Sequence, residues 1–99
     1  MNVKLIRMWS GEDVVADLVK ETDDSVTIAN PIVAVPSQQQ GHLGFAPWSP
    51  ILKERNTEID VTKRYVVYIT ETQDDVVDQY KEMFGNSAVA TPPKKRLIL

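Results

Sequence analysis

The sequence predicts a mainly β fold, a small, bent, five-stranded antiparallel barrel with a C-terminal helix. Segments rich in Val, Ile, Thr and Tyr follow one another closely and are separated by polar turns, a pattern typical of antiparallel sheets. Towards the C-terminal end the apolar spacing changes from that of strands to that of a helix. Successive strands followed by a single helix indicate a small barrel or sandwich.

The first two strands are expected at residues 3–9 and 14–21, joined by a polar turn. Gly11 lies in this turn, where a tight reversal favours a residue that adopts positive φ easily. In the second strand, alternation places three apolar residues on one face: Val14, Ala16 and Leu18. The other face is mixed, so we expect this strand to separate a core from a partly exposed surface.

The third strand is expected at residues 26–35, which are rich in β-branched side chains. Pro31 has no N–H to donate to a ladder, so the strand must bend or lie at an edge there, and Pro36 is expected to end it. The fourth strand is expected at residues 42–47 and again, after an interruption, at residues 50–54.

The clearest strand is expected at residues 64–70, which include two tyrosines and three β-branched aliphatic residues. Residues 55–63 precede it and are polar except for Ile59 and Val61. We expect these residues to form a long loop or an irregular extension.

One helix is indicated near the C-terminal end, with Thr72 as its expected N-cap. Its apolar stripe contains Val76, Val77, Tyr80, Met83 and Phe84. Gly85 or Asn86 is expected to end it. We therefore expect one domain over residues 1–86 and a flexible tail over residues 87–99.

Composition excludes several classes of protein. The 99 residues fit one compact domain, and the absence of cysteine excludes disulfides and thiolate metal sites. A cytoplasmic location is favoured, because small extracellular domains often depend on disulfides and the first residues lack the apolar stretch of a signal peptide. The net charge of −3, from 11 basic and 14 acidic residues, argues against broad, non-specific binding to nucleic acid.

No arrangement of residues predicts catalysis, so we expect this protein not to be an enzyme and to use no cofactor. Adjacent carboxylates occur only at turns or at a helix start, where acidic residues favour local structure: Glu12–Asp13, Asp23–Asp24 and Asp74–Asp75. His42 is the only histidine, too few for a zinc site in a chain without cysteine, and we expect no metal site. A site for Mg²⁺ or Ca²⁺ built from oxygen ligands alone stays open, although no loop has EF-hand spacing.

Two segments resemble the Sm-like (LSm) family of ring-forming small barrels. Residues 3–35 are similar to its first motif, with Gly11 at the turn glycine, Ala16 at the small mid-strand residue and Leu18 at the leucine. Residues 64–70 are similar to the last strand of its second motif. The resemblance implies a bent barrel of the Sm-like or SH3-like kind. It also implies a homo-oligomeric ring in which the fourth strand of one subunit pairs with the fifth of the next.

The chain departs from this family at its RNA-binding positions. The Asp and Asn of the family's first-motif turn fall on Thr22 and Val26. The Arg–Gly of the second motif has its nearest counterpart in Arg55 and Asn56. Members usually have a helix before the first strand, whereas here the expected helix lies at the other end. The resemblance therefore supports the barrel more than it supports RNA recognition.

The expected strand over residues 64–70 is also the predicted subunit interface. A long apolar strand at a free sheet edge tends to pair with another chain unless it is covered. The interface residues are Tyr65, Val66, Val67, Tyr68 and Ile69. In the alternative, the C-terminal helix covers this edge and the protein is a monomer.

RNA is a candidate ligand of such a ring, which would act as a binding or scaffold module. Phosphate contacts are expected from Lys53, Arg55, Asn56 and Arg64, and base stacking from Phe45 or Trp48. The alternative is a structural or protein-interaction barrel that does not bind nucleic acid. A protein partner is also conceivable at residues 94–99, where a basic triplet precedes three apolar residues.

Overall fold

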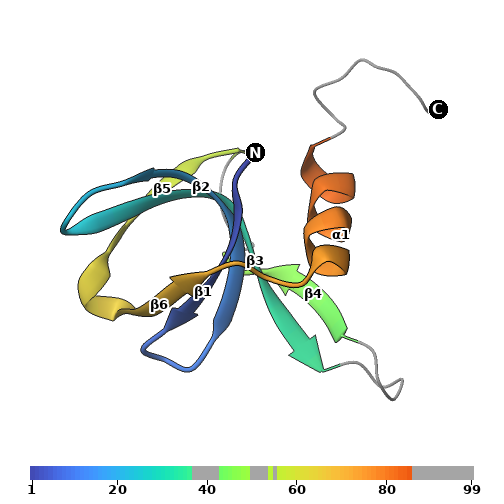
Figure 1. The fold of residues 1–99 in the computed structure, drawn as a ribbon, viewed down its shortest axis with the longest axis horizontal. Coiled ribbons are helices and arrows are strands. Elements are labelled where there is room, and N and C mark those ends of the chain that lie inside the picture. The colour runs from blue at the N-terminus through green and yellow to red at the C-terminus, as the bar shows by residue number, and fades with distance from the viewer. Residues whose placement is uncertain (37–42, 50–53, 55, 86–99) are drawn as a thin grey trace.

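The computed structural model describes residues 1–36, 43–49, 54 and 56–85. These residues form an antiparallel sheet of six strands and a C-terminal helix (Figure 1). The strands are β1 (Val3–Met8), β2 (Asp13–Glu21), β3 (Ser25–Pro36), β4 (Leu43–Pro47), β5 (Glu58–Thr62) and β6 (Val66–Thr70). A short 3₁₀ helix, η1 (Lys63–Tyr65), joins β5 to β6, and α1 (Asp74–Phe84) follows β6. The mainly β fold with a C-terminal helix is thus confirmed, but the sheet has six strands and the prediction of five is wrong.

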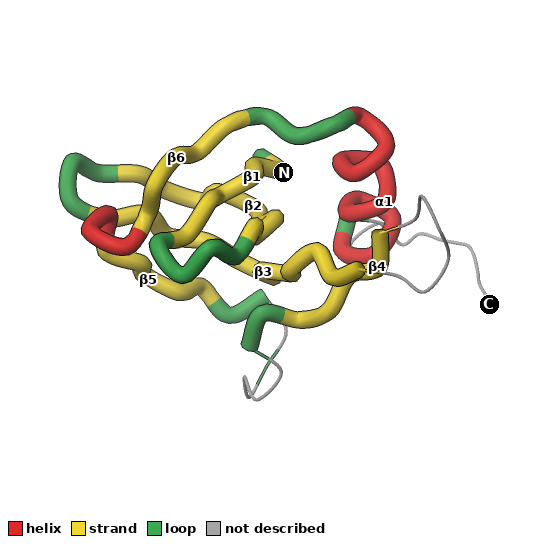
Figure 2. Tube along the Cα trace, turned by 90° about the horizontal axis from the view of Figure 1, so that it is seen from below, coloured by secondary structure: helices red, strands yellow, loops and turns green. Residues whose placement is uncertain are grey.

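The strands follow the order β4-β3-β2-β1-β6, and β5 also pairs with β3. The long strand β3 serves two partners along the edge that faces away from β2: residues 25–29 pair with β5 and residues 32–36 pair with β4. Figures 1 and 2 place β5 and β6 at one end of the molecule, and β4 with α1 at the other. Over the described residues, no strand pairing closes the sheet into a barrel.

Strand β5 lies where the sequence predicted a loop, so the prediction for residues 55–63 is wrong in its middle. Ile59 and Val61 point to the core, while Glu58 and Asp60 are exposed. This alternation of apolar and acidic residues is that of a half-buried strand. With two acidic residues in five positions, however, the sequence of the segment resembles that of a loop.

Strand β6 begins later than predicted because the residues before it form η1. The Thr62 side chain caps η1 by accepting a hydrogen bond from the backbone N–H of Arg64. Arg64 and Tyr65 therefore belong to the 3₁₀ turn, and the strand begins at Val66.

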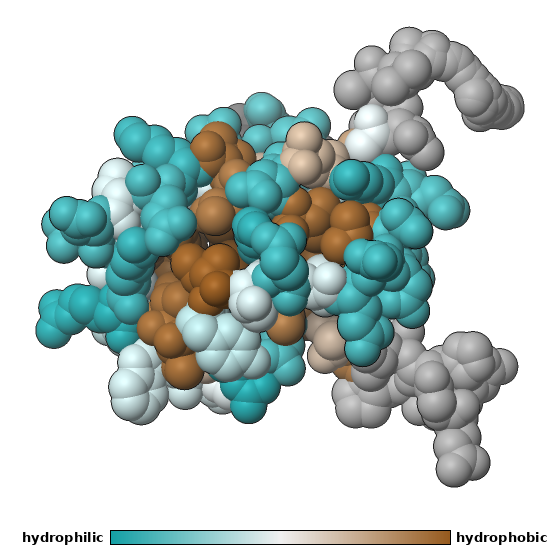
Figure 3. Space-filling view, in the orientation of Figure 1, coloured by the Kyte–Doolittle hydropathy of each residue, from teal (hydrophilic) through white to brown (hydrophobic). Residues whose placement is uncertain are grey.

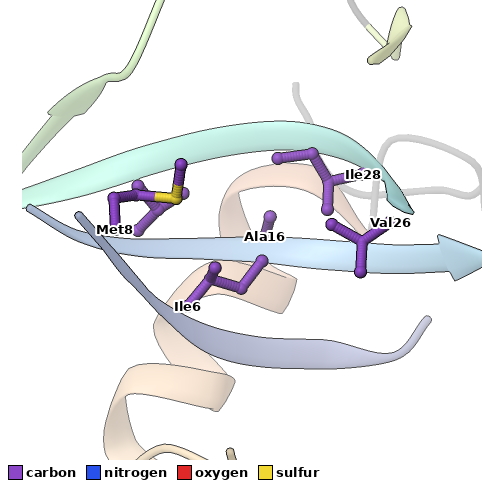
Figure 4. Packing of buried hydrophobic residues seen from close by; sticks show 6 residues of the cluster. Ile6, Met8, Ala16, Val26 and Ile28 are labelled. Carbon is purple, nitrogen blue, oxygen red and sulfur yellow. The ribbon is translucent and has the colours of Figure 1, made fainter. Parts of the chain in front are cut away.

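The sheet has apolar residues on both faces, and each face has its own core. The first core contains Ile6, Met8, Val14, Ala16, Val26 and Ile28, and Figure 4 shows these side chains gathering between β1, β2 and β3. Leu18 packs against this core with Val14 and Ala16, as the alternation in β2 predicted, whereas Val15 lies in the second core.

Strands β5 and β6 share the first core. Ile59 and Val61 of β5, and Val66 and Ile69 of β6, all pack against it. Strands at opposite ends of the pairing order can reach one cluster only if the sheet curls around it. The sheet is therefore strongly bent, although its hydrogen-bonded ladder is open.

Helix α1 covers the other face. Its predicted stripe is confirmed for four residues that form or border the second core: Val76, Val77, Tyr80 and Phe84. Tyr80 and Phe84 pack as a tilted aromatic pair with ring centroids 4.8 Å apart. The N-cap is Gln73, so the prediction of Thr72 is wrong by one residue. The last helical residue is Phe84 and Gly85 is the C-cap, which is one of the two residues, Gly85 or Asn86, predicted to end the helix. Asp74 and Asp75 lie in the first turn, where negative charge complements the helix dipole.

Strand β3 bends at Asn30 and Pro31, which is the first of the two alternatives, a bend or an edge position, predicted from the proline. Between Val15 and Asp17 strand β2 advances two residues, whereas β3 advances three, from Ile32 to Ala29. The extra residue in β3 makes a bulge that increases the local bend. Asn30 has a positive φ of 50°, a conformation that asparagine tolerates better than most residues.

The hydroxyl of Tyr80 binds the backbone groups at this bulge. It accepts a hydrogen bond from the Asp17 N–H at 3.0 Å and lies 2.9 Å from the carbonyl oxygens of both Ala29 and Asn30, to which it donates. Tyr80 is fully buried, so these backbone groups would otherwise face an apolar helix without a partner. One phenol therefore joins α1 to both strands at the point where β3 bends.

We predict that Tyr80→Phe lowers the free energy of unfolding by about 1–3 kcal/mol, because it leaves buried backbone groups unpaired. The measurement is urea unfolding followed by circular dichroism at one fixed protein concentration. Tyr68→Phe is the matched control, because Tyr68 is exposed and its hydroxyl should contribute less than about 0.5 kcal/mol. Equal midpoints for Tyr80→Phe and wild type would contradict the role given to this hydroxyl.

Burial raises the pKa of the Tyr80 phenol, and the nearby Asp17 carboxylate raises it further. In the unfolded chain the phenol ionises near pH 10, so above that pH the unfolded state binds fewer protons than the folded state. The contribution of Tyr80 is thus fully present below about pH 10 and is lost as the pH rises beyond it. We predict that the stability difference between wild type and Tyr80→Phe shrinks between about pH 9 and pH 11 in urea titrations. A stability difference between the two proteins that stays constant across this pH range would contradict the prediction.

Candidate assembly edge at strand β6

Strand β6 lies at one end of the sheet and uses one edge to pair with β1. Within the described part of the chain, no strand pairs with its other edge. Its sequence, Val-Val-Tyr-Ile-Thr, contains no charged residue, glycine or proline. Edge strands usually carry such residues, which hinder pairing with other chains.

A β-bulge divides the predicted interface residues into two groups. Tyr68 lies opposite Arg7 and Val66 lies opposite Met8, so Val67 has no counterpart in β1. Val66 and Ile69 point to the first core. Val67 and Tyr68 are 55% and 46% exposed, and so are available at the surface. Two of the five predicted residues thus support the core of the subunit instead of facing outwards.

A surface hollow of about 360 Å³ runs along β6. It is lined by Glu21, Lys63, Val66, Val67, Tyr68 and Ile69. Lys63 Nζ lies 2.8 Å from Glu21 Oε2, and the Lys63 N–H donates to the Asp24 carbonyl at 2.8 Å. These contacts attach η1 to the β2–β3 turn. The apolar edge of β6 is therefore bordered by a fixed ion pair.

Helix α1 does not cover this edge. It packs against the second core, to which β6 contributes no residue. In Figure 2 the helix lies at the end of the molecule away from β6. Figure 3 shows hydrophobic surface over the strands, between hydrophilic margins, and a second hydrophobic area beside α1. The alternative in which the helix shields the 64–70 segment therefore does not describe this fold.

Arg7 of β1 lies opposite Tyr68, on the paired side of β6, and is held by a partner of its own. Its guanidinium donates to Asp13 Oδ1 at 2.9 Å across the β1–β2 pair. This hydrogen bond and the carboxylate charge raise the pKa of Arg7. The side chain opposite Tyr68 is thus a cation that Asp13 already neutralises.

Of the four residues predicted to contact RNA phosphate, the structure describes Asn56 and Arg64. Lys53 and Arg55 lie outside the described residues. Arg64 is exposed in η1. Asn56 binds Asn30 instead: the Asn30 Nδ2 donates to Asn56 Oδ1 at 2.7 Å, and the Asn56 N–H donates to Asn30 Oδ1 at 3.1 Å. Both asparagines have positive φ, so this pair joins the strained bulge of β3 to the strained turn at Asn56.

The two aromatic residues predicted to stack on bases lie in different places. Phe45 packs against the second core and lines a cavity of about 250 Å³ beside the start of α1. Trp48 packs against the first core, on the other face of the sheet. Trp48 lines a different pocket, of about 310 Å³, beside the β1–β2 turn. The predicted docking segment at residues 94–99 lies outside the described residues.

Sequence reasoning missed β5, the strand that pairs with the first half of β3. The available signal was the alternation of Ile59 and Val61 with acidic residues. Among the described residues, no group of three or more His, Cys, Asp or Glu side chains could hold a metal ion. None of the described helices is long and apolar enough to cross a membrane.

Comparison of the sequence with protein-family models and with curated proteins finds no match. The case for function therefore depends on the edge strand, the two cores and the surface pockets described here.

We predict that Asn30→Ala lowers the free energy of unfolding by about 1–3 kcal/mol, because alanine is strained at positive φ and cannot bind Asn56. Asn30→Gly is the matched control, because glycine keeps the backbone conformation and removes only the side-chain hydrogen bonds. A double-mutant cycle of Asn30→Ala with Asn56→Ala should give a coupling of at least about 0.5 kcal/mol. If the losses in unfolding free energy of the two single variants simply added, the β3 bulge and the turn at Asn56 would be independent of each other.

Proposed function

We propose that this protein is a self-assembling β module, in which the free edge of β6 pairs with a strand of another copy to build a homo-oligomeric ring. The observation that carries the proposal is the uncharged, partly exposed edge of β6. A small domain with a thin core gains stability when such an edge is buried between subunits.

The partner strand in this proposal is β5 of the next copy. It uses one edge to pair with β3, and no strand pairs with the other within the described residues. Pairing of two different edges is heterologous, and it produces a ring when the rotation closes. The Sm-like resemblance implies the same arrangement, with β6 as the family's last strand. Strand β5 then takes the place of the family's fourth strand, and β4 is an additional hairpin strand.

The order β6-β1-β2-β3-β5 and the core that the end strands share support a bent, barrel-like subunit. Charge favours β5–β6 pairing over β5–β5 pairing, because the latter brings Glu58 and Asp60 of two copies together. Pairing of β6 with β6 would instead give a two-fold dimer. The two assemblies differ in mass, so one measurement separates them.

The assembled protein serves as a scaffold or protein-interaction module in this proposal, and RNA binding is not required. The negative net charge of the chain opposes phosphate binding. RNA stays a candidate ligand through Arg64, which is exposed. Salt-sensitive binding of short U-rich or A-rich RNA, measured by filter binding, would restore the RNA hypothesis.

We predict that Val67→Lys dissociates the assembly, because it places a charge on the edge that must be desolvated. Light scattering coupled to size-exclusion chromatography should give a multiple of 11.2 kDa for wild type and a single subunit for Val67→Lys. Val19→Lys is the matched control, since Val19 is an exposed valine at a β2 bulge and does not line the hollow along β6. It should assemble like wild type.

Circular dichroism of both variants checks that each is folded. A wild-type protein that stays a single subunit from micromolar to near-millimolar concentration would refute the assembly proposal. A stable dimer would replace the ring by the β6–β6 arrangement.

A further inference from the structure

A pocket of about 310 Å³ lies beside the β1–β2 turn, apart from the hollow along β6. It is lined by Met8, Trp9, Ser10, Glu12, Trp48, Val61 and Tyr65. Three of these residues are aromatic and one is a carboxylate. None of the described residues that line the pocket is basic. Its wall is thus rich in π-systems and carries negative charge.

The three aromatic residues come from separate parts of the chain, and backbone hydrogen bonds hold them in place. The Trp9 N–H donates to the Tyr65 carbonyl at 2.8 Å, which ties the end of β1 to η1. The Trp48 N–H donates to the Pro31 carbonyl at 3.0 Å, at the bend of β3. The pocket is therefore built by the same bend that shapes the sheet.

The aromatic side chains differ in burial. Trp48 is half-buried and packs against the first core, so it contributes a fixed wall. Trp9 and Tyr65 are 71% and 61% exposed. Large aromatic side chains exposed around a pocket give up contact with water at low cost when a ligand covers them.

Glu12 is fixed next to the indole of Trp48. Its Oε1 accepts a hydrogen bond from Trp48 Nε1 at 3.1 Å and another from Ser10 Oγ at 2.9 Å. Both of these bonds end on the same oxygen, so they leave Oε2 for another contact. A carboxylate held beside aromatic rings favours a cation with an apolar surface.

We propose that this pocket binds the quaternary ammonium group of a small, free organic cation. Cations are attracted to the faces of Trp and Tyr, and an alkylated ammonium also buries its methyl groups against them. The Glu12 carboxylate supplies the complementary charge. A volume of about 310 Å³ is at the lower end of the range for ligand pockets, which fits a compact ligand. The inference goes beyond the proposed assembly and does not depend on it.

The chain contains only two tryptophans, and both line this pocket, so its tryptophan fluorescence reports on the pocket directly. The experiment titrates the full chain with choline, with the carbon analogue in which a tert-butyl group replaces trimethylammonium, and with sodium chloride at matched ionic strength. We expect a saturable change with choline at millimolar concentration or below. The neutral analogue should bind about three- to thirty-fold more weakly.

Two variants test the named residues. Glu12→Gln removes the charge and keeps an oxygen that can accept from Trp48, and it should weaken choline binding severalfold. Asp23→Asn is its control, because it makes the same change of charge in the β2–β3 turn, away from the pocket. Trp9→Ala should abolish the saturable change at the same choline concentrations, with Trp48 remaining as the reporter.

Equal binding of choline and its neutral analogue would overturn the proposal, because the pocket would then select for shape and apolar surface only. A linear response that sodium chloride reproduces would overturn it as well. The choline titration is repeated with Val67→Lys, because Val67 does not line the pocket. Wild-type affinity in this variant supports a ligand site within one subunit, even if the assembly proposal fails. If choline binding were lost in Val67→Lys but present in wild type, the ligand site would depend on assembly, and this would contradict a site within one subunit.

Discussion

The hydroxyl of Tyr80 meets the backbone of β2 and β3 at the bulge around Asn30, and much of the structure depends on this contact. A bulge frees N–H and C=O groups that the sheet no longer pairs, and burying them without partners is costly. The phenol supplies both an acceptor and a donor at that point. It therefore stabilises the bend, and at the same time attaches α1 to the second face of the sheet.

The bend decides which strands β3 can pair with. Before it, β3 pairs with β5, and after it β3 pairs with β4. The first half curls with its neighbours until β5 and β6 share one core. This arrangement buries much of the apolar surface of a short chain, but it leaves the outer edge of β6 without a partner among the described residues. The bend that stabilises the subunit thus also leaves the edge on which the proposed assembly depends.

The edge and the aromatic pocket meet at one residue. The carbonyl of Tyr65 accepts from Trp9, its side chain lines the pocket, and the next residue begins β6. The proposed assembly and the proposed ligand site would therefore use neighbouring but distinct surfaces, one built from backbone edges and the other from aromatic faces. The two require different partners, namely a strand for the edge and a compact cation for the pocket.

By itself, the sequence determined the features that depend on local spacing: the β character, the alternation of Val14, Ala16 and Leu18, the turn at Gly11 (φ 92°) and the apolar stripe of α1. Only the tertiary structure decided that residues 58–62 form a strand, that Asn56 pairs with Asn30, and that Phe45 and Trp48 belong to different cores. The reason is physical. Periodicity follows from backbone geometry within a few residues, whereas pairing partners and shared pockets depend on segments that meet only after the chain has bent.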